Sequence, residues 1–272
     1  MKLKTKTKTY HLNERTHIMG ILNVTPDSFS DGGNYTTIQN AVEQAIKLEK
    51  EGADIIDIGG ESTRPGHEAV SIEEELNRVL PVIEAVKEKV SIPISIDTYK
   101  AETAKRAIEA GAEIINDIWG AKKDPDMAAV AAQYNVPIVL MHNRMNKNYK
   151  SLIEDMKNDL LESVIIAKKN GINEENIILD PGIGFAKTME HNLIVMNELD
   201  KIAELGFPLL LGTSRKSFIG QVLGVPANER DIGTGATTCL GIVKGVQIVR
   251  VHNVSLHYQL TKMMDAMLKR GK

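Results

Sequence analysis

The feature that most constrains the fold is a repeat of short apolar runs that end in polar residues and are separated by longer amphipathic segments. The runs have the length of buried β-strands, and the segments between them show helical spacing, as Ile38, Ala41 and Val42 do. Strands that alternate with helices are typical of an α/β protein with a parallel sheet. Eight runs fit this description: Ile18–Asn23, Asp54–Ile58, Ile92–Asp97, Ile114–Asp117, Pro137–Met141, Ile177–Asp180, Pro208–Gly212 and Gln247–Val251.

Glycines mark the ends of the predicted helices. A helix C-terminus commonly needs a residue with positive φ, which glycine adopts without steric cost. Such glycines precede five of the strands, at Gly52, Gly111, Gly171, Gly206 and Gly245. Eight strand–helix units can form an open doubly wound sheet or a closed (β/α)8 barrel. Because no long linker or shift in composition divides them, we predict a (β/α)8 TIM barrel as one domain over residues 1–272.

The first residues and several helix starts carry patterns of their own. Lysine and threonine alternate over residues 2–10, which predicts a short N-terminal β-hairpin with its lysines on a solvated edge. Capping boxes are predicted at Ser71 and at Ser151, each with a glutamate three residues later. Asp124 followed by Pro125 is typical of a helix N-cap and first helical residue.

Composition and charge narrow the class of protein. Apolar residues make up 42% and charged residues 25%, as in soluble globular proteins. The net charge of −3 gives no electrostatic basis for binding nucleic acid or an anionic membrane. The single cysteine, Cys239, excludes a disulfide within the chain and fits a reducing compartment. The sequence shows neither a secretory signal nor a run of about 18 apolar residues, so we expect a cytoplasmic protein with no membrane span.

The predicted strand ends carry most of the chemistry. In a (β/α)8 barrel the carboxyl ends of all strands face one shared mouth. A carboxylate directly after an apolar strand, as at Asp97 and Asp180, loses much of its hydration and needs a partner from the protein or a ligand. For Thr98 and Asp117, capping of the next helix explains the residue equally well. His142 ends the fifth strand, in a segment where we assign it no role.

Cationic and amide groups at other strand ends predict an anion site. Arg64, Lys216, Arg250 and His252 bring positive charge to the mouth of an acidic chain, which suits phosphate or diphosphate. Asn23 can offer a carbonyl oxygen to Mg²⁺, an ion that takes its other ligands from phosphate and water. The sequence contains no Walker motif, no zinc-binding His/Cys cluster and no nucleophile elbow, so nucleotide, zinc and serine-hydrolase chemistry are not indicated.

Taken together, the motifs resemble the dihydropteroate synthases of bacterial type, a pterin-binding family, over essentially the whole chain. Their joint occurrence in this order is highly specific. The matching motifs are MGILNVTPDSFSDGG at Met19–Gly33, DIGGESTRPG at Asp57–Gly66, SIDT at Ser95–Thr98, INDI at Ile115–Ile118, DPGIGFAKT at Asp180–Thr188, GTSRKSFIG at Gly212–Gly220 and RVHNV at Arg250–Val254.

The resemblance implies an enzyme of folate biosynthesis. It would join p-aminobenzoate to (7,8-dihydropterin-6-yl)methyl diphosphate and release 7,8-dihydropteroate and diphosphate. Matching positions imply four groups of site residues, in which Asp97, Lys216, Arg250 and His252 have catalytic roles. The pterin would be held by Asp97, Asn116, Asp180 and Lys216; the diphosphate by Asn23, Thr63, Arg250 and His252, with Mg²⁺ at Asn23; and p-aminobenzoate, in the pocket that sulfonamides occupy in this family, by Arg64, Pro65, Phe185, Lys216 and Ser217.

The chemistry of the two substrates predicts an SN1-like displacement. An aryl amine is a weak nucleophile, whereas electron release from the dihydropterin ring can stabilise a cation at the methylene once diphosphate leaves. The protein then acts by electrostatics and positioning, without a covalent nucleophile. The resemblance also implies that two loops close over the site, around Asp27–Asn34, which carries Phe29, and around Ser62–His67.

Two other functions fit parts of the pattern. A pterin-dependent methyltransferase domain that uses methyltetrahydrofolate and a corrinoid partner would share the barrel and the pterin-binding ends. It would not need the anion site at Asn23, Arg250 and His252. A barrel that binds ligands without turnover is the second alternative. The resemblance further implies a homodimer, to which the apolar last helices could contribute, although we expect Met263, Met264 and Met267 to pack against the barrel.

Overall fold

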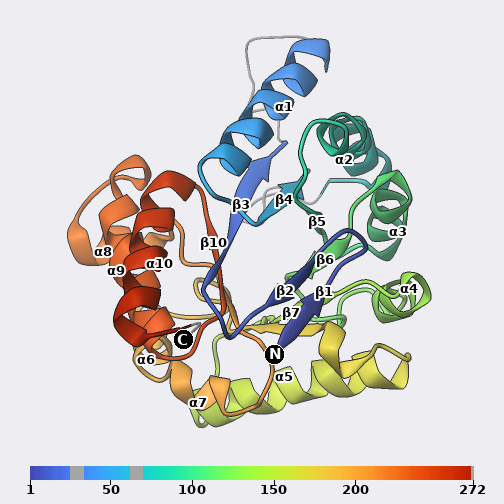
Figure 1. The fold of residues 1–272 in the computed structure, drawn as a ribbon. Coiled ribbons are helices and arrows are strands. Elements are labelled where there is room, and N and C mark those ends of the chain that lie inside the picture. The colour runs from blue at the N-terminus through green and yellow to red at the C-terminus, as the bar shows by residue number, and fades with distance from the viewer. Residues whose placement is uncertain (25–33, 62–69, 271–272) are drawn as a thin grey trace.

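The computed structural model describes residues 1–24, 34–61 and 70–270 and has eight parallel strands surrounded by helices (Figure 1). The order of strands in the sheet is β8-β7-β6-β5-β4-β3-β10-β9. An isolated parallel bridge between Leu179 and Leu209 then joins β8 to the chain just before β9 and closes the barrel. The strands are β3 (His17–Asn23), β4 (Ile55–Gly59), β5 (Ile94–Asp97), β6 (Ile114–Asp117), β7 (Ile138–Met141), β8 (Ile177–Asp180), β9 (Leu210–Leu211) and β10 (Ile248–Val251).

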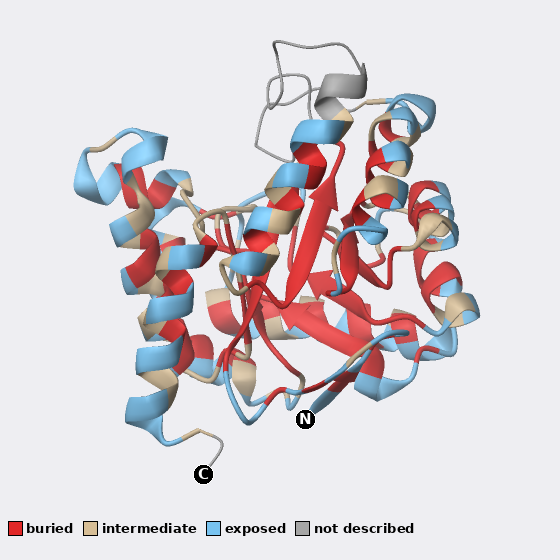
Figure 2. Ribbon diagram, turned by 45° about the horizontal axis from the view of Figure 1, so that its top comes forward, coloured by how far each residue is buried: buried red, intermediate tan, exposed pale blue. Residues whose placement is uncertain are grey.

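All eight strands lie within two residues of the predicted bounds, so the expected (β/α)8 barrel is confirmed. Figure 2 shows buried strands at the centre and helices whose inner faces are buried while their outer faces are exposed. The helices are α1 (Asn34–Lys50), α2 (Ile72–Lys87), α3 (Ala101–Ala110), α4 (Met127–Tyr134), α5 (Leu152–Lys169), α6 (Met189–Asn197), α7 (Leu199–Ala203), α8 (Ser217–Leu223), α9 (Asp231–Val243) and α10 (Val254–Leu268), with 3₁₀ turns at Glu174–Asn176 and Ala227–Glu229.

The predicted hairpin is present and closes one end of the barrel. It consists of the antiparallel strands β1 (Lys2–Lys4) and β2 (Thr9–His11), which lie across the barrel in Figure 1. The hairpin and the residue after it bury Leu3, Tyr10 and Leu12 while the lysines of β1 stay exposed. These three side chains belong to one apolar cluster with residues near the starts of seven barrel strands: Met19, Ile55, Ile114, Val139, Ile178, Leu210 and Ile248.

The predicted helix ends are confirmed more fully than the predicted helix starts. All five glycines named above have positive φ. The Ser71 hydroxyl accepts a hydrogen bond from the backbone N–H of Glu74, as a capping box requires. Ser151 makes no such bond, so that half of the prediction is wrong. The prediction at Asp124 is wrong as well, because its carboxylate accepts bonds from the N–H of Ala101 and of Asp126 and α4 begins later.

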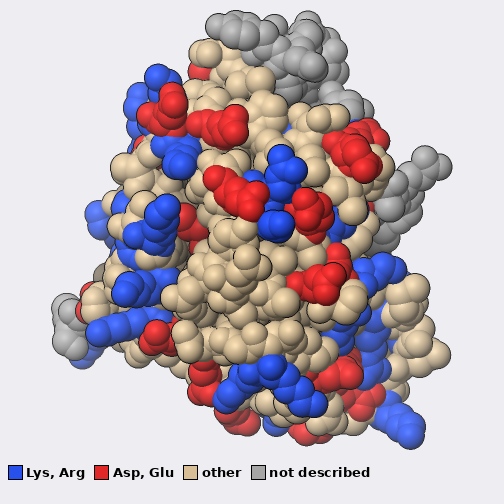
Figure 3. Space-filling view, turned by 90° about the vertical axis from the view of Figure 1, so that its right-hand side faces the viewer, with Lys and Arg blue, Asp and Glu red and all other residues tan. Residues whose placement is uncertain are grey.

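The surface of the last helices also differs from expectation. Met263 and Met267 on α10 are 60% and 55% exposed, so they do not pack against the barrel as predicted. Among the helices of residues 34–61 and 70–270, none is long and apolar enough to cross a membrane. On the face seen in Figure 3, on the side of α2, α3 and α4, acidic and basic side chains are intermixed, and neither sign forms a separate patch there.

Candidate active site

Strand register brings four of the conspicuous strand-end residues into one row. Asn23 on β3 pairs with Gly59 on β4, Gly59 pairs with Asp97 on β5, and Asp97 pairs with Asn116 on β6. Parallel strands in register place side chains of paired residues next to each other. A Cβ atom added at Gly59 would lie 3.4 Å from the Cβ of Asp97, so the glycine keeps this part of the mouth open.

Arg250 on β10 joins two buried carboxylates across the barrel. Its Nε donates to Oδ2 of Asp57 at 2.6 Å, and its Nη2 donates to Oδ2 of Asp97 at 2.6 Å. The Asn116 amide donates to the same Asp57 oxygen at 3.1 Å. Asp57 is a site residue that the sequence reasoning missed. The signal was available, because Asp57 interrupts the apolar run Ile55–Ile58 just as Asp97 follows one.

The carboxylates at the mouth are buried and incompletely bonded. Oδ1 of Asp57 and Oδ1 of Asp97 have no hydrogen-bond partner among the described residues. Burial raises the pKa of Asp97, the Arg250 guanidinium opposes this rise and the neighbouring Asp57 adds to it. Buried acceptors without partners are costly in a folded protein, so their presence points to a ligand that supplies N–H groups.

Asp180 and Lys216 form a second pair of opposite charges beside this row. Oδ1 of Asp180 accepts a hydrogen bond from the N–H of Gly182 at 2.7 Å. Burial raises the pKa of Asp180, although the Lys216 ammonium acts in the opposite direction. Burial also lowers the pKa of Lys216 to about 8, and Asp180 is the main group that opposes the fall. The Lys216 ammonium donates to the backbone carbonyl of Ile183 and lies 4.5 Å from the centre of the Phe185 ring.

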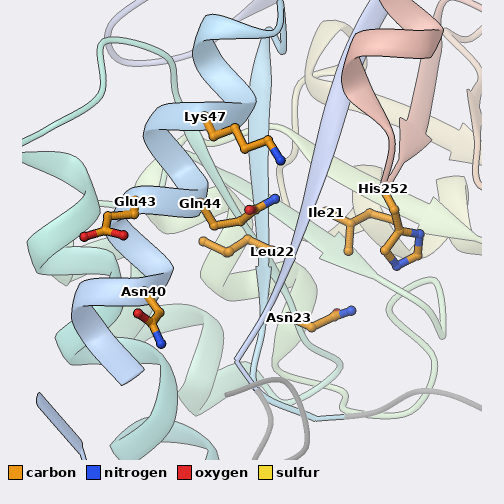
Figure 4. A pocket seen from close by; sticks show the side chains of 8 residues that line it. All are labelled: Ile21, Leu22, Asn23, Asn40, Glu43, Gln44, Lys47 and His252. Atoms are coloured by element: carbon orange, nitrogen blue, oxygen red, sulfur yellow. The ribbon is translucent and has the colours of Figure 1, made fainter. Parts of the chain in front are cut away.

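Asn23 and His252 line a cavity of about 550 Å³ between α1 and the ends of β3 and β10 (Figure 4). Nδ1 of His252 lies 2.8 Å from the Ser214 hydroxyl, which also accepts a bond from the His252 N–H at 3.1 Å. The other lining residues are Ile21, Leu22, Asn40, Glu43, Gln44 and Lys47. Beside the Glu43 carboxylate, the cavity has amide groups, the His252 imidazole and the Lys47 ammonium, which are groups that can bind an anion.

The described residues fit Mg²⁺ only as an ion that shares its ligands with the substrate. They contain no group of three or more His, Cys, Asp or Glu side chains that could hold a metal ion. Asn23 offers one neutral carbonyl oxygen at the rim of the cavity. Mg²⁺ usually keeps several waters and completes its coordination with phosphate oxygens, so a single amide ligand from the protein is consistent with its usual coordination.

The turn after β9 contains a residue, Arg215, with a strained backbone conformation. Arg215, between Ser214 and Lys216, has φ of +56°, a left-handed conformation that costs about 1 kcal/mol or more for a residue with a side chain. Two hydrogen bonds to Asp231 hold it, from Nε at 2.7 Å and from Nη2 at 2.9 Å. The pair fixes the turn from which the Lys216 side chain extends into the site.

Several predicted site residues remain to be placed. Thr63, Arg64, Pro65 and both expected loop segments, Phe29 included, lie outside the described residues. Ser217 is exposed at the first position of α8. Asp117 accepts bonds from the N–H groups of Trp119 and Ala121 in the turn after β6, so it has a structural role, although it does not cap the next helix as the alternative had it. His142 is buried, and its ring contacts Asp159 and Lys187.

Comparison with known proteins agrees with this geometry. The family model described as "Pterin binding enzyme" matches residues 19–252. A dihydropteroate synthase of Bacillus subtilis is 60% identical over 99% of this chain and 94% of its own length. The structure also resembles two solved dihydropteroate synthases.

The first, from Clostridium difficile in the presence of pteroic acid, has a TM-score of 0.93 and 49% identity and covers 95% of this chain and 98% of its own. The second, from Xanthomonas albilineans with 4-aminobenzoic acid, has a TM-score of 0.94 and 39% identity over 98% of both chains. The chain therefore belongs to the pterin-binding enzymes and, within them, to the dihydropteroate synthases.

Proposed function

We propose that this dihydropteroate synthase works by an SN1-like displacement, in which p-aminobenzoate captures a pterin methylene cation after diphosphate has left. The observation that carries the proposal is the cluster of three buried carboxylates, Asp57, Asp97 and Asp180, around two cationic side chains. Such a site favours a ligand that offers N–H groups and develops positive charge. A dihydropterin ring does both.

The pterin fits the row formed by Asp97, Asn116 and Asp180. The pyrimidine edge of a pterin presents an exocyclic amine beside a ring N–H, and one carboxylate can accept both bonds. The unpartnered Oδ1 of Asp97 is a further acceptor, and the Asn116 amide can both donate and accept. As the methylene becomes cationic, the negative charges of Asp97 and Asp180 stabilise the ring that shares this charge.

The diphosphate fits the cavity side of the mouth. Asn23 and His252 line that cavity. Arg250 lies on β10, two residues before His252 in the chain. Nε and Nη2 of Arg250 are bonded to carboxylates, which leaves Nη1 to donate to a phosphate oxygen. When bound with the diphosphate, Mg²⁺ would neutralise part of its charge, with Asn23 as its protein ligand. His252 can hold or deliver a proton at the departing oxygen.

The p-aminobenzoate fits beside Phe185 and Lys216, with Ser217 at the edge. A flat aryl ring can pack against Phe185, and the nearby ammonium can meet the carboxylate. Closure of the mouth would exclude water that could otherwise capture the cation. The Asp57–Arg250–Asp97 arrangement already holds the acceptors in place, so little reorganisation is needed when charge develops.

A direct assay tests the overall reaction and its alternatives. Purified protein receives the pterin diphosphate, p-aminobenzoate and Mg²⁺, and the formation of dihydropteroate is measured together with diphosphate release. We expect equal amounts of both products. Methyl transfer from methyltetrahydrofolate to a corrinoid, or binding of both substrates without turnover, would contradict the proposal.

A kinetic isotope experiment tests the SN1-like step separately. A pterin diphosphate with two deuterium atoms on the methylene should react more slowly than the protium form, because the methylene carbon becomes planar before the amine bonds to it. A rate ratio of one in single-turnover experiments, with product formation intact, would contradict the dissociative mechanism and leave the overall reaction unaffected.

Exposed apolar side chains on the last helices support the expected homodimer. Leu240 and Val243 on α9 and Met263 and Met267 on α10 are between 38% and 60% exposed. A cluster of this kind on two adjacent helices is typical of an interface between subunits. Sedimentation should show a dimer for the wild-type protein and a monomer for Val243→Lys. A wild-type monomer at micromolar concentration would rule the interface out.

A further inference from the structure

The loop after β8 has a backbone conformation that is unfavourable without contacts from the rest of the protein. Gly182, Gly184 and Ala186 all have positive φ, at +65°, +86° and +47°. For Ala186 this left-handed conformation carries a steric cost, because its Cβ approaches the following carbonyl. The loop from Pro181 to Lys187 must therefore be fixed by contacts outside its own backbone.

Lys187 supplies contacts from inside the loop. Its side chain is 95% buried, and its ammonium donates to the carbonyl of Gly182 at 2.9 Å and to that of Phe185 at 3.1 Å. The Tyr149 hydroxyl donates to the carbonyl of Ala186 at 2.9 Å. One buried cation thus ties the start of the loop to the residue that carries the Phe185 ring.

His142 is the third acceptor of the Lys187 ammonium. Nδ1 of His142 lies 2.9 Å from Nζ of Lys187, and Nε2 lies 3.0 Å from Oδ2 of Asp159. Hydrogen bonds from His142 and Arg144 lower the pKa of Asp159 despite the opposing effect of burial, so its carboxylate accepts. Nε2 therefore carries the proton of the imidazole, and Nδ1 is free to accept from the ammonium.

The loop is in direct contact with a residue of the proposed site. Lys216 donates to the carbonyl of Ile183 in the middle of the loop, and its ammonium lies over the Phe185 ring. A Cβ atom added at Gly184 would lie 2.8 Å from Cδ of Lys216. A shift of this loop would therefore move Phe185 and Lys216 together.

We propose that Lys187 is a positioning residue for p-aminobenzoate: its buried ammonium, oriented by His142 and Asp159, fixes the loop that places Phe185 against Lys216. The inference rests on the proposed p-aminobenzoate pocket. A methionine would fill the same space without a charge, so the function of the lysine lies in its three hydrogen bonds. Burial also lowers the pKa of Lys187 to about 7, which shows that the protein keeps this group at a cost to its charged form.

The variant Lys187→Met removes the hydrogen bonds and keeps the length of the side chain. We expect KM for p-aminobenzoate to rise about tenfold or more, since an error of about 1 Å in placement has large kinetic effects. KM for the pterin diphosphate should rise less than KM for p-aminobenzoate, because Asp97 and Asn116 lie on other strands and only Asp180 and Lys216 of the proposed pterin residues bond to this loop. The matched control is Lys157→Met, which removes a half-buried lysine on α5 whose ion pair within the described residues is with Glu154.

Two variants of His142 keep the test decisive if Lys187→Met does not fold. Asparagine places an acceptor near the position of Nδ1 and should keep KM for p-aminobenzoate near the wild-type value, whereas leucine should raise it as Lys187→Met does.

Equal changes in KM for both substrates, or no change with Lys187→Met or His142→Leu folded and active, would overturn the positioning role. Equal KM values in the asparagine and leucine variants of His142 would do the same. Failure of the wild-type protein to form dihydropteroate would instead refute the proposed function, so the two outcomes are separated by the wild-type assay.

Discussion

The two ends of the barrel bury polar groups in opposite ways. At the end closed by the hairpin, Asp54 satisfies its neighbours: its carboxylate accepts bonds from Arg15 and from the N–H of Ile18, and its backbone carbonyl accepts from the Tyr10 hydroxyl at 2.7 Å. At the mouth, Asp57 and Asp97 keep buried oxygens without partners among the described residues. The first arrangement stabilises the fold, whereas the second leaves binding capacity for a ligand.

The contrast between Asp54 and Asp57 shows that burial alone does not identify a functional carboxylate. Asp54 and Asp57 lie three residues apart on either side of the same strand start, and both are less than 10% exposed. What separates them is whether all their acceptor sites are bonded within the protein. Substitutions at the mouth should therefore change activity more than stability, and substitutions at the closed end should do the reverse.

The largest effect is expected for Asp97→Asn at the mouth. The variant removes the charge that pairs with Arg250 and that, in the proposed mechanism, would stabilise the pterin cation, so kcat/KM should fall about a thousandfold, or about 4 kcal/mol. The free energy of unfolding should stay the same or rise, because Arg250 keeps its bond to Asp57 and the variant no longer buries the Asp97 charge, whose desolvation raises the pKa of that carboxyl. Steady-state kinetics and urea unfolding measure the two quantities. Wild-type rates in the purified variant would end the assignment of Asp97.

The opposite result is expected for Leu12→Ala at the closed end. Leu12 is fully buried in the cluster of the hairpin and the strand starts, so its truncation should cost about 3 kcal/mol of unfolding free energy. The kcat/KM of the folded variant should stay within about twofold of the wild-type value. A large loss of activity at a temperature where the protein is fully folded would show that the two ends are coupled.

His17 is the exception at the closed end and gives a test by pH. Its buried Nδ1 has no hydrogen-bond partner in the described part of the chain, and burial lowers its pKa to about 4. The unfolded chain binds this proton near pH 6.5, so the contribution of His17 to stability is complete above that pH and is lost as the pH falls toward 4.

The variant His17→Phe keeps an aromatic ring beside Tyr10 and removes this titration. Its unfolding free energy should fall less between pH 7 and pH 4.5 than that of the wild type, by about 2 kcal/mol. Urea unfolding at several pH values measures the slope. Parallel curves for the two proteins would show that the imidazole does not set the acid limit of stability.

The smallest effect is expected for Ser71→Ala at the start of α2. Loss of the bond to the Glu74 N–H should cost about 1 kcal/mol of unfolding free energy. Turnover should not change beyond about twofold, because the cap only satisfies a helix terminus. Thermal unfolding and the standard assay check this, and a drop in kcat comparable to that of Asp97→Asn would contradict the distinction.

The fold could be predicted from the sequence because each strand–helix unit has a pattern that neighbouring residues carry. An apolar run, a polar end and a glycine with positive φ are properties of neighbouring residues, and all eight strands were found from them. The error at Asp124 concerns a side chain that had more than one partner available. Asp124 bonds the N–H of Ala101 on the preceding helix, which only the packed structure brings near.

The candidate site could be predicted only as far as single strand ends go. Asp97 and Asp180 were identified because each ends a strand, and Asn116 because it is the last residue but one of β6, whereas Asp57 was missed because it lies in the middle of β4. The contact between Lys187 and His142 joins residues 45 positions apart, and no local pattern marks it. The exposure of Met263 and Met267 likewise depends on which face of α10 meets the barrel, and methionine spacing does not settle that.

The hairpin that closes one end of the barrel affects the order in which the protein folds. Leu3, Tyr10 and Leu12 are synthesised before any of the barrel strands, yet the cluster that buries them includes Ile248 on β10, the last of those strands. The N-terminal segment therefore cannot reach its final environment until nearly the whole chain has been made. Contacts of such long sequence separation form late and slow folding.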